Sequence, residues 1–160
     1  MNIYEGLAEV KTLRARLDEL AQFRRASNVY ETGSTPDFRF DDLTDQIEKI
    51  FARITELKLA ILVANQANDV KVGNEEMQLA RAILELSNVR TRLGYVTEMV
   101  KPGRGGFGLL ERERRLSNEV PEIAQKSKAD LLKAKEQYEK RKNALDSAIQ
   151  EANNKVALPI

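Results

Sequence analysis

The segment that decides the fold spans Leu43 to Ala64 and reads LTDQIEKIFARITELKLAILVA. Its apolar residues recur at alternating steps of four and three, a heptad pattern that places them on one face of an α-helix. They are Leu43, Ile47, Ile50, Ile54, Leu57, Ile61 and Ala64. The first six are large, and burying them contributes roughly 9–18 kcal/mol in total. Because a single helix cannot cover its own apolar face, the segment predicts that other helices pack against it.

Three other segments show the same helical period. Residues 2–25 have an apolar residue at every third or fourth position from Ile3 to Phe23, and Asn2 is the expected N-cap. Residues 74–100 and 121–154 carry similar apolar stripes. We expect Asp41 to cap the central helix, residues 42–66, and Asn74 to cap the third.

These patterns predict an all-α fold for residues 1–160 as a single helical domain. We expect an antiparallel bundle of about four long helices with coiled-coil-like seams and a Gly-rich loop before the last helix. The composition agrees, because charged residues make up 32% of the chain and aromatic residues only 6%. Arg141 interrupts the apolar stripe of the last helix, so its charged end should reach solvent or an acidic partner.

The end of the central helix carries more apolar residues than one face can hold. Lys58 is the only polar residue from Leu57 to Ala64, which indicates a helix buried on several sides and therefore a homo-oligomer. Asn68 is expected to bind helix-end carbonyls or to fix register, with a ligand role as the alternative. Aromatic residues in the loop after the first helix should hold that loop against the bundle or a neighbouring subunit. The candidate interface residues are Leu59, Leu62, Val63, Tyr30, Phe38 and Phe40.

Composition also excludes several functions. The chain has no Cys and no His, which removes thiolate and imidazole metal sites and Ser-His-Asp machinery, so we predict neither a metal site nor a cofactor nor enzymatic activity. The net charge of +1 gives no overall attraction to nucleic acid. The N-terminal residues lack the pattern of a secretory signal, and the longest apolar run, Leu59 to Ala64, is far below the ~20 residues of a membrane span. We expect a soluble, cytoplasmic protein without stable membrane insertion.

The segment KPGRGGFGLLERERR, residues 101–115, is the one motif that resembles a ligand site. Backbone N–H groups of a glycine-rich loop can surround an anion, and arginine binds phosphate through two hydrogen bonds. The segment lacks the Lys-Ser or Lys-Thr of a phosphate loop, so a plain linker and a partner-peptide site stay open as alternatives. The candidate phosphate-binding residues are Lys101, Gly103, Arg104, Gly105, Gly106, Arg112, Arg114 and Arg115.

Four stretches resemble a family of small bacterial helical proteins that carries the name septicolysin. They are LAEVKTLRARLDELAQF (7–23), ETGSTP (31–36), ARITELKLAILVANQAND (52–69) and ALDSAIQEANNKVAL (144–158). The resemblance implies a helical, oligomeric protein without an assigned activity, and the name implies pore formation only as an alternative. The glycine-rich loop from Gly103 to Gly108 departs from the family, so no role for it is implied.

Three functions follow from these observations. The first is a non-enzymatic helical oligomer that acts by binding or scaffolding. The second is an oligomeric binder of a phosphate-bearing ligand, a nucleotide or nucleic acid, through residues 101–115. The third is a membrane-active protein, which the mixed charges of the polar helix faces disfavour.

Overall fold

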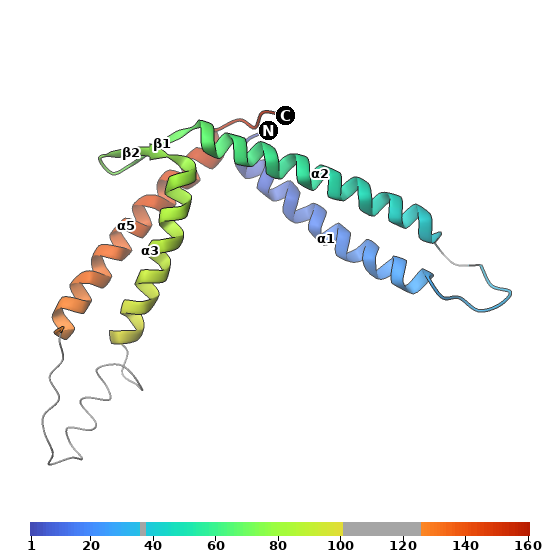
Figure 1. Cartoon of the computed structure of the whole chain (residues 1–160), viewed down its shortest axis with the longest axis horizontal. Coiled ribbons are helices and arrows are strands. Elements are labelled where there is room, and N and C mark those ends of the chain that lie inside the picture. Colours follow the sequence, from blue (N-terminus) through green and yellow to red (C-terminus); the bar gives the residue numbers. More distant parts are fainter. Residues whose placement is uncertain (36–37, 101–125) are drawn as a thin grey trace, which may run out of the picture. The chain divides into compact units, whose positions relative to one another are not determined.

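The computed structural model describes residues 1–35, 38–100 and 126–160 of the chain (Figure 1). Within these residues, four long helices and one two-stranded antiparallel sheet make up the regular structure. The elements are α1 (Ile3–Ser27), α2 (Phe40–Ala67), β1 (Asp69–Val72), β2 (Glu75–Gln78), α3 (Leu79–Val100) and α5 (Lys128–Lys155). The prediction of an all-α fold with about four long helices is therefore confirmed.

The chain divides into two compact units. The first comprises Met1–Asn68 and Glu151–Ile160, and the second comprises Asp69–Gln150. α1 and α2 belong to the first unit, whereas the two strands, α3 and most of α5 belong to the second. Each unit therefore contains one pair of long helices.

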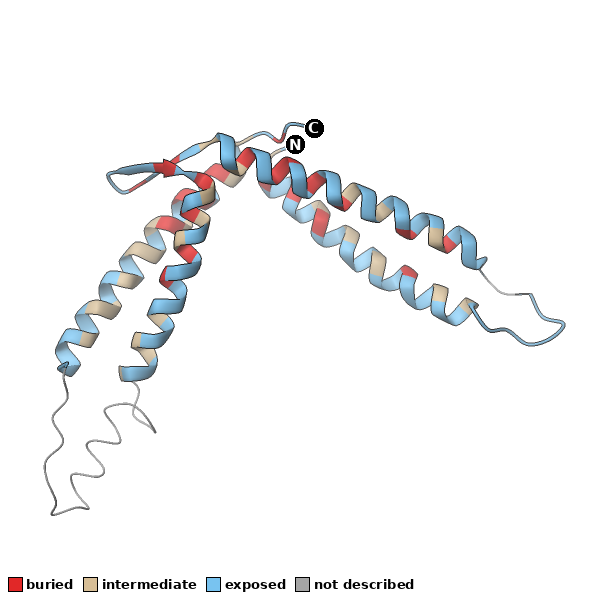
Figure 2. Ribbon diagram, in the orientation of Figure 1, coloured by how far each residue is buried: buried red, intermediate tan, exposed pale blue. Residues whose placement is uncertain are grey.

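In the first unit, α1 and α2 lie side by side and run in opposite directions (Figure 1). Two groups of buried residues join them (Figure 2). One group is Val10, Ile54 and Leu57, the other is Leu20, Leu43 and Ile47, and the half-buried residues between them are Leu13, Leu17 and Ile50. The heptad face of α2 is therefore the face that α1 covers, as its spacing predicts.

The ends of α2 differ in how well the sequence predicts them. The prediction that Asp41 is the N-cap is wrong, because α2 begins at Phe40 and its N-cap, Arg39, makes no side-chain cap hydrogen bond. Asp41 instead lies in the first turn, where the positive end of the helix dipole favours a carboxylate. At the other end, the Asn68 side-chain amide donates a hydrogen bond to the Ala64 carbonyl at 2.8 Å, which confirms its predicted role.

The last residues of the chain fasten the beginning of α1. Asn2 caps α1 as predicted, in a reciprocal pair of hydrogen bonds with Glu5. The amide of Ile3 donates to the Val156 carbonyl at 3.1 Å, and the amide of Leu158 donates to the Met1 carbonyl at 2.9 Å. Leu158 is buried over Gly6, where an added Cβ would lie 2.5 Å from the Leu158 Cδ1. A glycine at this position is what lets the C-terminal segment approach the helix.

The second unit begins with a β-hairpin, and here the expected start of the third helix is wrong. β1 and β2 pair antiparallel with Val72 opposite Glu75, so Gly73 and Asn74 form a two-residue turn. Gly73 has a φ of 64°, which a glycine adopts without steric cost. Asn74 therefore lies in a turn and is not a helix cap, and α3 begins at Leu79. The expected first turn, residues 75–78, is strand β2.

α3 and α5 are linked by ion pairs between their side chains. The Arg141 guanidinium donates to Glu85 of α3 at 2.6 Å and to Glu75 of β2 at 2.8 Å, which confirms the prediction of an acidic partner. Hydrogen bonding to Glu85 is the main reason that the pKa of Arg141 is raised. Arg90 of α3 also contacts Asp146 of α5 at 2.7 Å. The predicted start of this helix at Pro121 lies outside the described residues.

Replacing Arg141 by Ala is expected to lower the free energy of unfolding by about 1–3 kcal/mol, because the change removes both pairings and the packing of the side-chain stem. Lys140→Ala is the matched control, since Lys140 is exposed and, among the described residues, pairs only with Glu136 one turn away. It should cost no more than about 0.5 kcal/mol. Urea denaturation followed by circular dichroism measures both, and equal effects of the two variants would contradict the expectation.

Candidate functional site

The predicted phosphate-binding residues cannot be placed. Lys101, Arg104, Arg112, Arg114 and Arg115, together with the glycines among them, lie outside the described residues. The phosphate site in residues 101–115 therefore stays a prediction from the sequence.

α2 has a second apolar face on the side away from α1. Phe51, Leu59, Leu62 and Val63 are each more than half exposed, and we call these four residues the α2 outer face. Their spacing of three, four and eight residues places them on one side of the helix. Leu57, Ala60, Ile61 and Ala64 are buried on the opposite side. Within one chain, this end of α2 is thus buried on one side only, and the expectation of burial on several sides is not met by the chain itself.

The aromatic residues of the α1–α2 loop divide into two kinds. Phe38 contacts Phe23 of α1 with ring centroids 5.2 Å apart, and the Arg24 guanidinium lies 5.5 Å from the centre of the Phe40 ring. Phe38 holds the loop against α1, as expected, and Phe40 makes its contact from the first residue of α2. Tyr30 and Val29 are exposed. Sequence reasoning grouped Tyr30 with the interface candidates but left Phe51 out, although Phe51 lies two turns before Leu59 on the same side of the helix.

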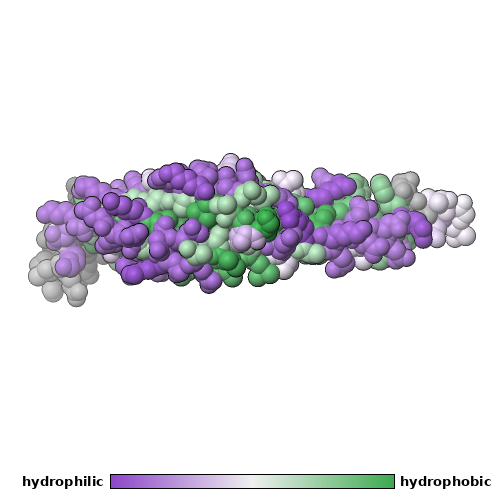
Figure 3. Space-filling view, turned by 90° about the horizontal axis from the view of Figure 1, so that it is seen from above, coloured by the Kyte–Doolittle hydropathy of each residue, from purple (hydrophilic) through white to green (hydrophobic). Residues whose placement is uncertain are grey.

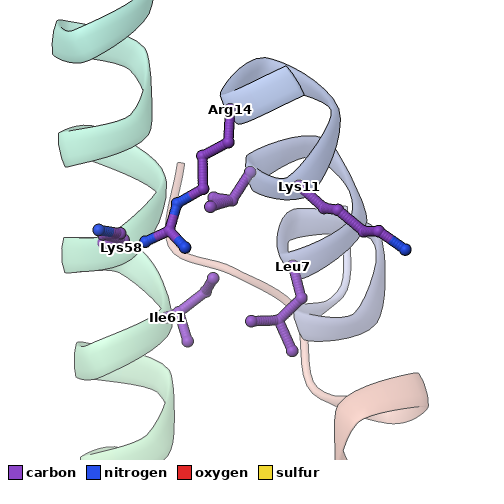
Figure 4. Close-up of a pocket in the computed structure, with 6 residues that line it drawn as sticks. Leu7, Lys11, Arg14, Lys58 and Ile61 are labelled. Carbon is purple, nitrogen blue, oxygen red and sulfur yellow. The ribbon is translucent and has the colours of Figure 1, made fainter. Parts of the chain in front are cut away.

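A groove opens between α1 and α2 in the first unit. It has a volume of about 360 Å³, and its lining residues are Leu7, Val10, Lys11, Arg14, Lys58 and Ile61. In Figure 4 the Arg14 side chain extends from α1 toward Lys58 of α2, and Leu7 and Ile61 face each other beneath them. The Lys11 side chain points away from α2. The groove therefore combines an apolar floor with cationic side chains from both helices, Arg14 of α1 and Lys58 of α2.

The cations of the groove differ from Arg53, which precedes Lys58 by five residues on α2. Arg53 donates to Glu9 of α1 at 2.8 Å and to Glu56 at 2.7 Å. Hydrogen bonding to Glu9, and then to Glu56, raises the pKa of Arg53. Arg14 and Lys58 have no ion pair or hydrogen bond within residues 1–35, 38–100 and 126–160. This contrast indicates that the groove holds positive charge that the described part of the chain does not neutralise.

The sequence analysis did not identify the groove. The signal available in the sequence was weak, because positive residues on the polar side of a helix are ordinary. One hint was that Lys58 has only uncharged residues three and four positions away on α2, so no carboxylate of its own helix faces it. What joins Arg14 to Lys58 is the packing of α1 on α2, which the sequence alone does not reveal.

The described residues offer little for other kinds of chemistry. They contain no group of three or more acidic side chains arranged to hold a metal ion. None of the described helices is long and apolar enough to cross a bilayer. On the face seen in Figure 3, hydrophobic side chains lie among hydrophilic ones. The α2 outer face and the groove are two features of the described chain with a shape or charge suited to binding.

Comparison with protein families identifies residues 9–158 with a group described as "Family of unknown function (DUF6847)". The chain belongs to this family. Comparison with curated proteins found no match. Among solved structures, the crystal structure of a functionally unknown conserved protein from Corynebacterium diphtheriae is similar, with a TM-score of 0.76 and 22% sequence identity. The match covers 99% of this chain and 98% of the other, so the two proteins share a fold over their whole length.

Proposed function

We propose that this protein is a non-enzymatic, cytoplasmic homo-oligomer that acts by binding or scaffolding, and that the α2 outer face joins its copies. The observation that carries the proposal is the second apolar face of α2, which the chain itself leaves exposed. The resemblance to the septicolysin family also implies an oligomeric, helical protein, and membership in that family is part of the proposal.

A second copy of the chain is the partner that fits this face best. The positions between Phe51 and Gln66 on the outer side of α2, including Thr55 and Leu59, are all uncharged. Two identical uncharged patches related by a two-fold axis can meet without removing any charge from water. Glu56 and Lys58 lie at the edges of the patch, where charges remain hydrated.

The expected strength of this association follows from the exposure of the four side chains. About half of each side chain remains to be buried, which is worth about 0.75–1.5 kcal/mol per residue, or about 6–12 kcal/mol for the eight residues of a pair. Association itself costs about 4–15 kcal/mol. The two ranges overlap, so we expect a reversible oligomer whose population depends on concentration.

Replacing Leu59 and Leu62 together by Glu is expected to dissociate the oligomer without unfolding the chain, because both side chains are exposed and each new charge would be buried in the interface. Leu84→Glu is the matched control, since Leu84 is an exposed leucine of α3, outside the α2 outer face. Sedimentation velocity over a range of concentrations measures the mass of each variant.

The proposal predicts that the unmodified protein and Leu84→Glu sediment as oligomers, whereas the double variant sediments as a monomer with unchanged helix content. If the double variant assembles like the unmodified protein, the α2 outer face is not the interface. If the unmodified protein is a monomer at every concentration, the proposal of a homo-oligomer is wrong.

A further inference from the structure

We infer that the groove between α1 and α2 binds a small amphiphilic anion, with a phosphate or carboxylate head against Arg14 and Lys58 and an apolar chain over Leu7, Val10 and Ile61. This inference goes beyond the proposed assembly and does not depend on it, because every lining residue belongs to the first unit of one chain.

The charge of the groove selects an anionic head group. Like charges that line one groove without a carboxylate partner repel each other, and a bound anion would replace that repulsion with charge-assisted hydrogen bonds. Arg14 is also suited to a head group with several oxygens, since its guanidinium can donate two parallel hydrogen bonds. Asp18 lies one turn beyond Arg14 on α1 but forms no ion pair with it in the described structure. No described carboxylate therefore occupies the position that the ligand head would take.

The floor of the groove selects an apolar body. Val10 and Ile61 contribute buried side chains to it, and Leu7 contributes a side chain that is nearly half exposed. A small hydrophilic anion such as inorganic phosphate would contact the cations but leave this surface facing water. An alkyl chain covers it, and the gain grows with the apolar area removed from water.

The groove has the size of a small-molecule site. Its volume of about 360 Å³ lies at the lower end of the range of about 300–1,000 Å³ that is usual for ligand pockets. A phosphate with a medium-length alkyl chain suits a site of this size. A mononucleotide is both larger and more polar on the side that would face the floor.

Octyl phosphate is a suitable probe because it joins both features and is soluble as a monomer. Isothermal titration with the full chain, below the concentration at which the probe aggregates, should show saturable binding of one octyl phosphate per chain. Inorganic phosphate supplies the head alone and octanol supplies the chain alone. Each should bind at least about tenfold more weakly than octyl phosphate, a difference of about 1.4 kcal/mol.

The variant Arg14→Gln with Lys58→Gln tests the assigned residues. It should weaken the binding of octyl phosphate by about tenfold or more. The matched control is Arg16→Gln with Lys49→Gln, which removes one positive charge from each of the same two helices at exposed positions outside the groove. The control should bind octyl phosphate within about twofold of the unmodified protein, apart from long-range screening.

The same variants provide a readout that a purely structural role would not give. Without ligand, the Arg14 and Lys58 double variant should melt at the same temperature as the unmodified protein or higher, because it removes a repulsion and no ion pair of the described chain. Octyl phosphate should raise the melting temperature of the unmodified protein and the control, and should raise that of the groove variant much less.

Three results would overturn the inference. One is equal binding of octyl phosphate by the groove variant and the control. Another is binding of octanol as tight as that of octyl phosphate, which would leave the cations without a role. The third is binding to vesicles of an anionic phospholipid with none to monomeric octyl phosphate, which would assign the positive charge to a membrane surface. Loss of assembly in the α2 outer-face variants would leave this inference unaffected.

Discussion

Replacing Ile54 by Asp is expected to prevent the first unit from folding. Ile54 is only 6% exposed and packs with Val10 and Leu57 in the centre of the contact between α1 and α2. The change loses the burial of a large side chain and places a charge where no partner is present. We expect a loss of at least about 4–5 kcal/mol, which is comparable with the whole stability of many domains.

The control for this change is Ala21→Asp. Ala21 lies on α1 and is exposed, so its variant carries the same new charge into water. Far-ultraviolet circular dichroism during heating should show a normal transition for Ala21→Asp and a lost or greatly weakened one for Ile54→Asp. A soluble, helical Ile54→Asp protein with an unchanged melting temperature would mean that the heptad face of α2 is not a core.

Replacing Leu158 by Ala is expected to lower the free energy of unfolding by about 2–4 kcal/mol, the usual cost of deleting a buried leucine side chain. Leu158 is 6% exposed and lies over Gly6 and next to Ile61. Its amide also holds the Met1 carbonyl, so the change loosens the contact between the C-terminal segment and the start of α1. Ile160→Ala is the control, because Ile160 is exposed and should cost less than about 0.5 kcal/mol.

The role of Gly6 can be tested in the same experiment. A methyl group at Gly6 collides with Leu158, but in a helix alanine is about 1 kcal/mol more favourable than glycine. Gly6→Ala should therefore be more favourable in the Leu158→Ala background than in the unmodified protein. Urea denaturation of the four proteins of this double-mutant cycle measures the coupling. A coupling of zero would show that Gly6 and Leu158 do not share the space that the structure assigns to them.

The helices were the most predictable part of this protein. The seven-residue repeat from Leu43 to Ala64 is long and uninterrupted, so it determined both the existence of α2 and the face that is buried. Single polar side chains were predictable where a local rule applies, as with the cap at Asn2 and the hydrogen bond of Asn68. Arg141 was predictable because a charge in an apolar stripe requires a partner.

The β-hairpin was predicted wrongly because two local rules competed. Asn74 followed by acidic residues resembles the start of a helix. The same Asn74 follows Gly73, and a Gly-Asn pair between short apolar segments also indicates a two-residue hairpin turn. Val70 and Val72 alternate with polar residues and are buried, which is the strand signal that decides the matter. The alternation of Val70 and Val72 is therefore a better guide to this segment than the helix-cap signal at Asn74.

The groove could not be predicted because it forms only where α1 packs against α2. Arg14 and Lys58 are far apart in the sequence, and their meeting depends on how α1 lies on α2. Phe51 is hard to assign for a different reason, since it lies outside the dense apolar run that begins at Leu57. The site features of this protein are thus properties of packing between helices, whereas its secondary structure is a property of local spacing.

The central claim is that α2 has two apolar faces, one covered by α1 and the other by a second copy of the chain. Because the protein contains no cysteine, single-cysteine variants allow the rate of thiol labelling to report the exposure of each face. Ala60→Cys probes the covered face, Leu59→Cys the outer face, and Leu84→Cys an exposed leucine of α3. The account predicts that Ala60→Cys labels slowly and Leu84→Cys quickly at every protein concentration, whereas Leu59→Cys labels quickly when dilute and slowly when concentrated. Labelling of Leu59→Cys as fast as Leu84→Cys at all concentrations would contradict it.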